Sequence, residues 1–215
     1  MLRKIPLLIL VLFFFWGGIA GSEEIRLPTP KYTGKLSLEE ALTRRRSERS
    51  YYPNQLTNEQ ISQLLWAAQG ITEPQWGFRA APSAGSCYPL EVYLVNPKGV
   101  YNYIPQSHSL KLTLKDDQRP SLARAALGQN FISEAPINIV ITAVFERTEE
   151  KYGQRAGRYV YMEAGHAAEN IALMAVALGL GSVTVGSFWD DVVKSVLDLP
   201  AEQEPIYIIP VGYAK

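Results

Sequence analysis

The chain has a single cysteine, two histidines and no excess of charge of either sign. One thiol, Cys87, excludes an internal disulfide, so packing must hold the fold together. The 21 basic residues are balanced by 21 acidic ones, which argues against electrostatic binding to nucleic acid. Small molecules are the expected partners. With 215 residues, 47% of them hydrophobic, the chain is long enough for one well-buried core.

The scarcity of histidine also argues against a metal site. Glu163 and His166 have the Glu-x-x-His spacing of half a di-iron bundle, but that site needs the motif twice. The other histidine, His108, falls in an expected strand or turn. We expect no metal, and we interpret His166 as a helical residue that hydrogen-bonds Glu163 or a partner chain.

Long apolar runs are confined to the N-terminus. Arg3 and Lys4 precede the run "IPLLILVLFFFWGGIA", and small residues follow it up to Ser22. This pattern predicts a signal peptide over residues 1–22, with export to the periplasm or another extracytoplasmic space. The run is shorter than the roughly 20 residues of a membrane span. An uncleaved segment that anchors the protein to a membrane is the alternative.

Helices are predicted from caps and periodicity. Capping boxes at Ser37 and Thr57 open two helices, the second closed by Gly70. A short helix is expected near residues 121–127, another near 190–197, and the longest from about 150 to 179. The middle of the longest is rich in Ala and Gly, which predicts burial in the core or at a subunit interface.

Strands are predicted at six places outside these helices. Residues 90–95 and 100–104 form an expected hairpin, and "HSLKLTL" adds a third strand. "PINIVITAVF" is apolar on both faces, as a central strand covered on both sides would be. "SVTVG" and "PIYIIPVG" complete the set. Residues 23–35 are expected to be an extended lead-in without a core of its own, and residues 71–89 a long loop.

The segment "RRRSERSYY" concentrates positive charge in a neutral chain. Four arginines fall within six positions at the end of the first predicted helix. Favourable interaction with the negative end of the helix dipole is one explanation. Neutralisation of a bound anion is the other.

The order of four segments resembles the nitroreductase family of flavin enzymes. "RRRSERSYY" is followed by "APSAGSCYP", by "RYVYMEAGHAAENIALMAVALGLGSVTVGSF" and by "PIYIIPVG". The resemblance covers residues 36–212 and looks nearest to the branch whose dehydrogenases oxidise thiazolines and oxazolines. It implies an α+β fold with a central mixed, mainly antiparallel sheet flanked by helices, a homodimer, and noncovalent FMN, all in one domain over residues 36–215.

The family pattern of Arg, any residue, Ser, any residue, basic residue matches Arg45, Ser47 and Arg49. By that resemblance Arg45 holds the FMN phosphate, Ser47 hydrogen-bonds nearby, and Arg49 lies near N1 and O2 of the flavin. Guanidinium groups suit phosphate, because they donate two parallel hydrogen bonds. Arg46 is a neighbouring candidate. Lys215 is a candidate phosphate ligand too, although the chain ends earlier than many relatives do.

Two further segments match flavin-contacting positions of the family. In relatives a Pro-Ser loop from the second subunit reaches the flavin, which implicates Pro82, Ser83, Ala84 and Ser86. A surface turn of small residues is the alternative. Near flavin N5 the matching residues are Val185, Gly186 and Ser187. Many relatives have glutamate before this glycine, so Val185 limits hydrogen bonding there to backbone groups.

Lys151 and Tyr152 match a Lys-Tyr pair of azoline dehydrogenases, and such a pair can move a proton. The alternative is an exposed first turn of the long helix. "GLGSVTVG" lacks the strand-turn-helix order of a dinucleotide fingerprint, so NAD(P)H, if it donates hydride, docks transiently. The prediction is a ping-pong FMN oxidoreductase acting on a small molecule. A non-catalytic flavin-binding or flavin-sequestering protein is the alternative.

Overall fold

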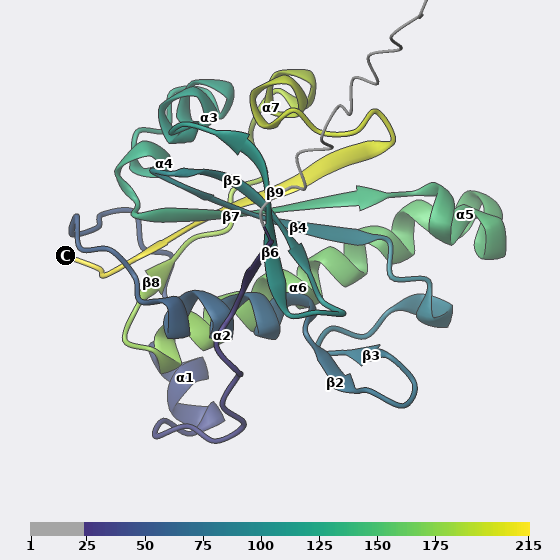
Figure 1. Cartoon of the computed structure of the whole chain (residues 1–215), viewed down its shortest axis with the longest axis horizontal. Helices are drawn as coiled ribbons and strands as arrows, with labels where there is room; N and C mark the ends of the chain where they lie inside the picture. The colour runs from purple at the N-terminus through teal and green to yellow at the C-terminus, as the bar shows by residue number, and fades with distance from the viewer. Residues whose placement is uncertain (1–23) are drawn as a thin grey trace, which may run out of the picture.

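The computed structural model describes residues 24–215. A seven-stranded sheet runs through the molecule, and helices cover both of its faces (Figure 1). The strand order is β1-β6-β5-β4-β7-β9-β8, and each neighbouring pair is antiparallel. The predicted α+β fold with a mainly antiparallel sheet is confirmed. The strands are β1 (Glu24–Arg26), β4 (Leu90–Asn96), β5 (Gly99–Ile104), β6 (Ser109–Lys115), β7 (Ile137–Val144), β8 (Gly181–Ser182) and β9 (Gln203–Gly212).

Strand β7 is the interior strand that the sequence predicted. All eight of its residues are buried between β4 and β9. Alternate side chains enter two separate cores because successive residues of a strand point to opposite faces. Ile139 and Ile141 join the core beneath α2 (Asn58–Gln69) and α6 (Ala156–Ala177), whereas Val140 joins the other core.

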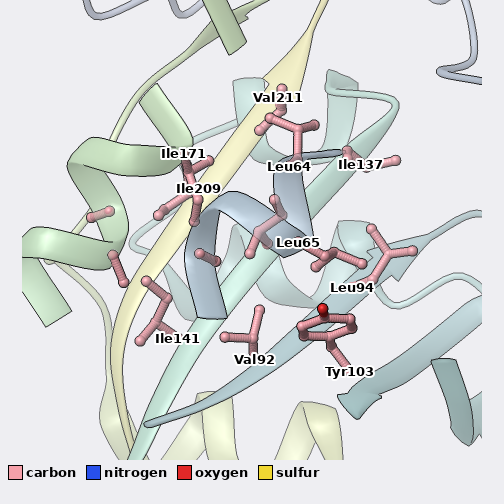
Figure 2. Close-up of a cluster of buried hydrophobic side chains, with 14 of the residues drawn as sticks. Leu64, Leu65, Val92, Leu94, Tyr103, Ile137, Ile141, Ile171, Ile209 and Val211 are labelled. Atoms are coloured by element: carbon pink, nitrogen blue, oxygen red, sulfur yellow. The ribbon is translucent and has the colours of Figure 1, made fainter. Parts of the chain in front are cut away.

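The first core is built on one face of the sheet by α2 and α6. Figure 2 shows Leu64 and Leu65 of α2 lying over strand side chains such as Val92, with Ile171 of α6 beside them. Helix α6 contributes mostly alanines to this core, and their small size lets α2 approach closely. The predicted burial of the long helix is therefore confirmed. Helix α1 (Leu38–Arg44) packs against α6.

Helices α3, α4 and α7 cover the opposite face (Figure 1). They span Arg119–Ala125, Phe131–Glu134 and Asp190–Leu197. Helix α7 matches its predicted range, and α3 begins two residues earlier than predicted. Both predicted capping boxes are confirmed. The Ser37 and Thr57 side chains each accept a hydrogen bond from the backbone N–H three residues on, and the Glu40 and Gln60 side chains accept one from the backbone N–H of Ser37 and Thr57.

Three predictions about local structure need correction. The expected helix over 150–179 is divided into α5 (Glu146–Tyr152), a 3-10 turn at Gly153–Arg155, and α6. Gly153 breaks it with φ +52° and ψ −135°, a conformation reserved for glycine. The expected loop over 71–89 contains a hairpin, β2 (Ile71–Glu73) and β3 (Phe78–Arg79), and a 3-10 turn, η1 (Ala84–Ser86).

The third correction concerns a strand. "SVTVG" pairs over Gly181–Ser182 only and then by a single bridge between Val185 and Ile208. The lead-in was predicted to be extended without a core of its own. In the structure β1 pairs with β6 at the sheet edge, and Leu27 packs against the first core.

The predicted signal peptide is a further correction. Residues 1–22 lie outside the described residues, so no structural evidence supports that assignment. Within residues 24–215, no helix is both long and apolar enough to cross a membrane. The signal peptide is therefore not supported, and the extracytoplasmic location of the protein stays a prediction.

Candidate active site

Three segments distant in sequence meet at the β8 edge of the sheet. The arginine segment, residues 44–52, follows α1 and runs beside β8, where Ser47 forms a parallel bridge with Ser182. The backbone N–H of Glu48 donates to the carbonyl of Ser182 at 3.0 Å. The C-terminal residue is the third segment: the backbone N–H of Lys215 donates to the carbonyl of Ser50 at 3.1 Å.

Tyr51 fixes the arginine segment to the core. Its ring is buried, and its hydroxyl donates to the carbonyl of Glu48 and lies 3.3 Å from that of Pro210 on β9. Burial raises the pKa of this phenol above its ordinary value, so it remains a neutral donor. Gly181 permits the close approach: a Cβ there would lie 2.7 Å from Cγ of Glu48. The segment thus has a defined register on the sheet.

The backbone after α1 is extended, and successive side chains of an extended segment point in opposite directions. Residues 45–49 therefore alternate between two sides of the segment. Arg44, Arg46 and Glu48 line a cavity of about 650 Å³ with Gly181 and Tyr213 among its other walls. The Arg46 guanidinium also donates to the carbonyls of Thr43 and Arg45, at 3.0 and 2.6 Å.

Arg45, Ser47 and Arg49 occupy the alternate positions. Arg45 Nε lies 3.7 Å from a carboxylate oxygen of Glu169 on α6, and both side chains are partly exposed. The Arg49 guanidinium lies 6.0 Å from the centre of the Phe131 ring. The spacing matched in the sequence therefore corresponds to one side of a single segment, and Arg46 lies apart from it.

The segment after β8 supplies a second wall. Val185 is buried, and it exchanges two 2.9 Å backbone hydrogen bonds with Ile208. Gly186 and Ser187 are exposed beyond it, and Gln129 Nε2 donates to the Ser187 carbonyl at 3.0 Å. A Cβ at Gly186 would meet only the Tyr207 ring, at 3.6 Å. Packing within this chain does not require glycine there, which fits a close approach by another molecule.

Pro82, Ser83, Ala84 and Ser86 lie elsewhere, near the junction of α5 and α6. Lys151 Nζ donates to the carbonyl of Gly85 at 3.2 Å, and Lys151 and Tyr152 would clash with a Cβ at Gly85. Tyr152 packs edge-to-face on Tyr159, with ring centres 4.9 Å apart. Lys151 and Tyr152 end α5, so they lie before the long helix α6 and not in its first turn.

The two groups of predicted site residues are well separated. Arg45 contacts α6 at Glu169, whereas the Lys151–Tyr152 pair precedes the first residue of α6, Ala156. Thirteen helical residues correspond to roughly 20 Å at 1.5 Å per residue. Figure 1 shows α5 at one end of the view and β8 with the C-terminus at the other. One chain does not bring all of the predicted residues together.

The histidines differ from each other in environment. His166 is exposed on α6. His108 is half-buried, its Nε2 lies 2.7 Å from Ser62 Oγ, its Nδ1 lies 2.8 Å from Tyr103 Oη, and burial lowers its pKa. Across the described residues no group of His, Cys, Asp or Glu side chains is arranged to hold a metal ion.

Sequence reasoning missed several residues of these two groups. Phe131, Gln129 and Glu169 contact the predicted site residues from α4, its preceding loop and α6. No local motif marks them, because each reaches the site through tertiary packing. Glu163 was considered only as a metal ligand or partner of His166, yet it is buried and close to Ser83.

The residues at the β8 edge fit FMN in their chemistry. Arg45 and Arg49 provide guanidinium donors on one side of the arginine segment, with the Ser47 hydroxyl between them. Gly186 presents backbone without a side chain. These groups suit a phosphate and a flat, polar-edged ring.

A model described as the nitroreductase family matches residues 42–213. A protein of Methanocaldococcus jannaschii, provisionally named a nitroreductase, is 44% identical over 196 residues, covering 88% of this chain and 96% of that protein. The microcin B17-processing protein McbC of Escherichia coli is 28% identical over 158 residues, 68% of this chain and 58% of McbC. A crystal structure from Ralstonia eutropha, also provisionally named a nitroreductase, matches with a TM-score of 0.82 and 32% identity, over 89% of this chain and 90% of that one.

Proposed function

The chain belongs to the nitroreductase family of oxidoreductases, and from that premise we propose that it binds FMN and transfers hydride from a donor to a small organic acceptor in two separate steps. The observation that carries the proposal is that Ser47, between Arg45 and Arg49, bridges Ser182 of β8, and that the segment continuing from β8 exposes the backbone of Gly186. Each of these groups suits a different part of the cofactor.

Bound FMN supplies an N5 atom that accepts hydride and gives it up again. In this chain, Arg45 would exchange its pairing with Glu169 for the phosphate, and Ser47 would add a hydroxyl hydrogen bond. Arg49 would place positive charge at the N1 and O2 edge. The backbone at Gly186 and Ser187 would lie against the ring near N5, because no side chain blocks it there. NAD(P)H is the donor that we propose.

We propose that the site is shared between two chains. In the loop of residues 82–86, Gly85 contacts Lys151 at the end of α5, whereas Arg45 of the same chain contacts Glu169 of α6. A second copy of the chain would bring its own loop to the flavin, together with Lys151 and Tyr152. Lys151 holds the loop through Gly85, so the pair and the loop would arrive as one unit.

Azoline oxidation is the second candidate, and the Lys151–Tyr152 pair favours it. The two polar groups both lie within 3 Å of the position of a Cβ on Gly85. When an azoline is oxidised to an azole, one ring carbon loses hydride and the neighbouring carbon loses a proton, and a lysine in its neutral amine form or a tyrosine phenolate can take up that proton. The identity with McbC, named a microcin B17-processing protein, supports this candidate.

An anaerobic visible spectrum tests the proposal. The purified full-length protein is titrated with NADH or NADPH and then with an acceptor such as a nitroaromatic or a quinone. We expect a bound flavin that bleaches with a donor and recovers with an acceptor. A flavin that binds but exchanges hydride with none of them supports the alternative, a flavin-sequestering protein. A colourless protein that does not take up added FMN refutes the proposal.

A further inference from the structure

A buried polar cluster lies beneath the loop of residues 82–86. We call it the loop-support cluster: Gln69, Arg79, Ser83, Tyr88 and Glu163. Glu163 of α6 and Gln69 at the end of α2 are 2% and 1% exposed. Polar groups so deeply buried cost free energy unless they are paired, so their arrangement calls for a structural reason.

The cluster is connected on the side of the loop. Ser83 Oγ accepts a hydrogen bond from the Tyr88 backbone N–H at 2.9 Å. The Arg79 guanidinium donates to Gln69 Oε1 at 3.0 Å and stacks on the Tyr88 ring at 4.5 Å. These contacts hold both ends of the loop, since Ser83 begins it and Tyr88 follows it.

The cluster is incomplete on the side of the helix. Ser83 and Gln69 interact with the Glu163 carboxyl closely enough to lower its pKa, but Glu163 Oε1 and Gln69 Nε2 are buried without a hydrogen-bond partner. One is an acceptor and the other a donor. A small movement of the loop or of either side chain would therefore complete the network.

The pKa of Glu163 lies close to neutral pH. Burial raises the pKa of Glu163 to about 7, against the opposing effects of Ser83, Arg79 and Gln69. Of the charged groups on the elements that pack around it, Arg79 of β3 is the one that acts on this carboxyl. Arg79 in turn faces Glu91 of β4 and Arg147 of α5.

We propose that Glu163 is a positioning residue that holds the loop of residues 82–86 through Ser83, and that the loop is held more tightly when this carboxyl is ionised. Because Ser83 Oγ accepts from Tyr88, its own hydroxyl proton is available to Glu163. A carboxylate accepts from Ser83 and Gln69 together, whereas the protonated acid uses one oxygen for its own proton. The consequence for cofactor binding rests on the proposed function.

Hydrogen exchange of the loop tests the proposal without any cofactor. Protection factors of residues 80–88 in the full-length protein are measured from pH 5.5 to 8.5 and corrected for intrinsic exchange. We expect protection to rise about tenfold through a midpoint near pH 7, as expected for one hydrogen bond to a charged group. Glu163→Gln should abolish the step, because its amide does not titrate.

Two further variants complete the design. Ser83→Ala should also abolish the step, which keeps the proposal testable if Glu163→Gln folds poorly. Glu169→Gln, an exposed carboxyl on the same helix, should retain it. Loop protection that is independent of pH in the wild type, or a step that survives in Glu163→Gln, overturns the proposal.

The affinity for FMN is then measured over the same pH range. In the wild type we expect the FMN affinity to rise over the same pH range as the loop protection. In Glu163→Gln we expect the FMN affinity to show no such pH dependence. If the wild type binds no FMN at any pH, the proposed function fails while the loop measurement still decides the role of Glu163.

Discussion

Arg45 and Arg46 are neighbours in sequence but face different surroundings. Arg45 points toward Glu169 of α6. Arg46 donates to the carbonyls of Thr43 and Arg45 and lines the cavity of about 650 Å³, whose lining residues do not include Arg45. Their difference arises from the extended backbone after α1, which ends at Arg44. A pair of alanine substitutions can therefore separate a specific phosphate contact from a general effect of positive charge.

Arg45→Ala is expected to weaken FMN binding by about 10-fold to 150-fold, since a hydrogen bond to a charged group contributes about 1.5–3 kcal/mol. Arg45 is partly exposed, so folding should be little affected. Arg46→Ala is the matched control and should change the affinity much less. Flavin fluorescence titration measures both dissociation constants. Equal losses in the two variants would remove the specific role of Arg45.

Arg49→Gln is expected to lower the flavin reduction potential while FMN stays bound. The positive charge near N1 favours the anionic reduced ring, and its loss should shift the potential by on the order of 30 mV, about 1.4 kcal/mol for a two-electron couple. Equilibration with a reference dye under anaerobic conditions measures the shift. An unchanged potential would place Arg49 away from the ring.

Glu163→Gln is expected to stabilise the fold at high pH. Folding raises the pKa of Glu163 from its usual value of 4.5 to about 7, so the wild-type carboxyl favours the folded state below pH 4.5 and loses that contribution as the pH rises to about 7. Urea unfolding at pH 5 should show little difference, and at pH 8 the variant should be more stable by about 2–3 kcal/mol. A difference that does not grow with pH would show that the carboxyl is not titrating there.

At the scale of elements, local sequence signals predicted most of the fold. Both capping boxes, the interior strand and the 90–104 hairpin depend on neighbouring residues, and the structure confirms them. The single helix predicted over 150–179 was wrong because periodicity on both sides of Gly153 continues although the backbone does not. The pairing of β1 with β6 depends on contacts 85 or so positions apart, which no local pattern carries.

The candidate site was predictable to the extent that a family pattern marks it. Arg45, Ser47 and Arg49 form such a pattern, and they lie at alternate positions of one segment; their role in cofactor binding stays a prediction. The loop-support cluster escaped prediction because Gln69, Arg79 and Glu163 come from three elements that only tertiary packing brings together. A carboxyl in a helix rich in alanine was the one available signal, and after a metal site was rejected it was considered only as a hydrogen-bond partner of His166.

Two glycine substitutions test how the segments at the β8 edge meet. Gly181→Ala places a methyl 2.7 Å from Cγ of Glu48, so the arginine segment must move, and we expect a stability loss of about 1–3 kcal/mol with weaker FMN binding. Gly186→Ala meets only an ordinary contact at 3.6 Å. It should leave stability within about 0.5 kcal/mol and still weaken FMN binding. Thermal unfolding and FMN titration of both variants separate the effects, and unchanged FMN affinity in Gly186→Ala would exclude a close approach there.

At the scale of the whole molecule, the predicted flavin residues divide into two groups, one that reaches α6 at Glu169 and one that includes Lys151 and Tyr152 ahead of its first residue. The arginine segment and Gly186 lie near β8, and the loop of residues 82–86 lies with Lys151 and Tyr152 near α5. In the dimer that we propose, a second chain would join the groups without moving either of them within its own chain. The long separation within one chain is thus the reason to expect a site shared between two.

Sedimentation velocity with flavin absorbance tests this central claim most directly. The full-length protein is loaded with FMN, diluted in steps, and followed both at a protein wavelength and at a flavin wavelength. If the partner's loop completes the site, flavin sediments only with the dimer, dilution releases it, and added FMN shifts the chain toward the dimer by mass action. A monomer that carries FMN at full occupancy would contradict the account, because one chain would then form the whole site.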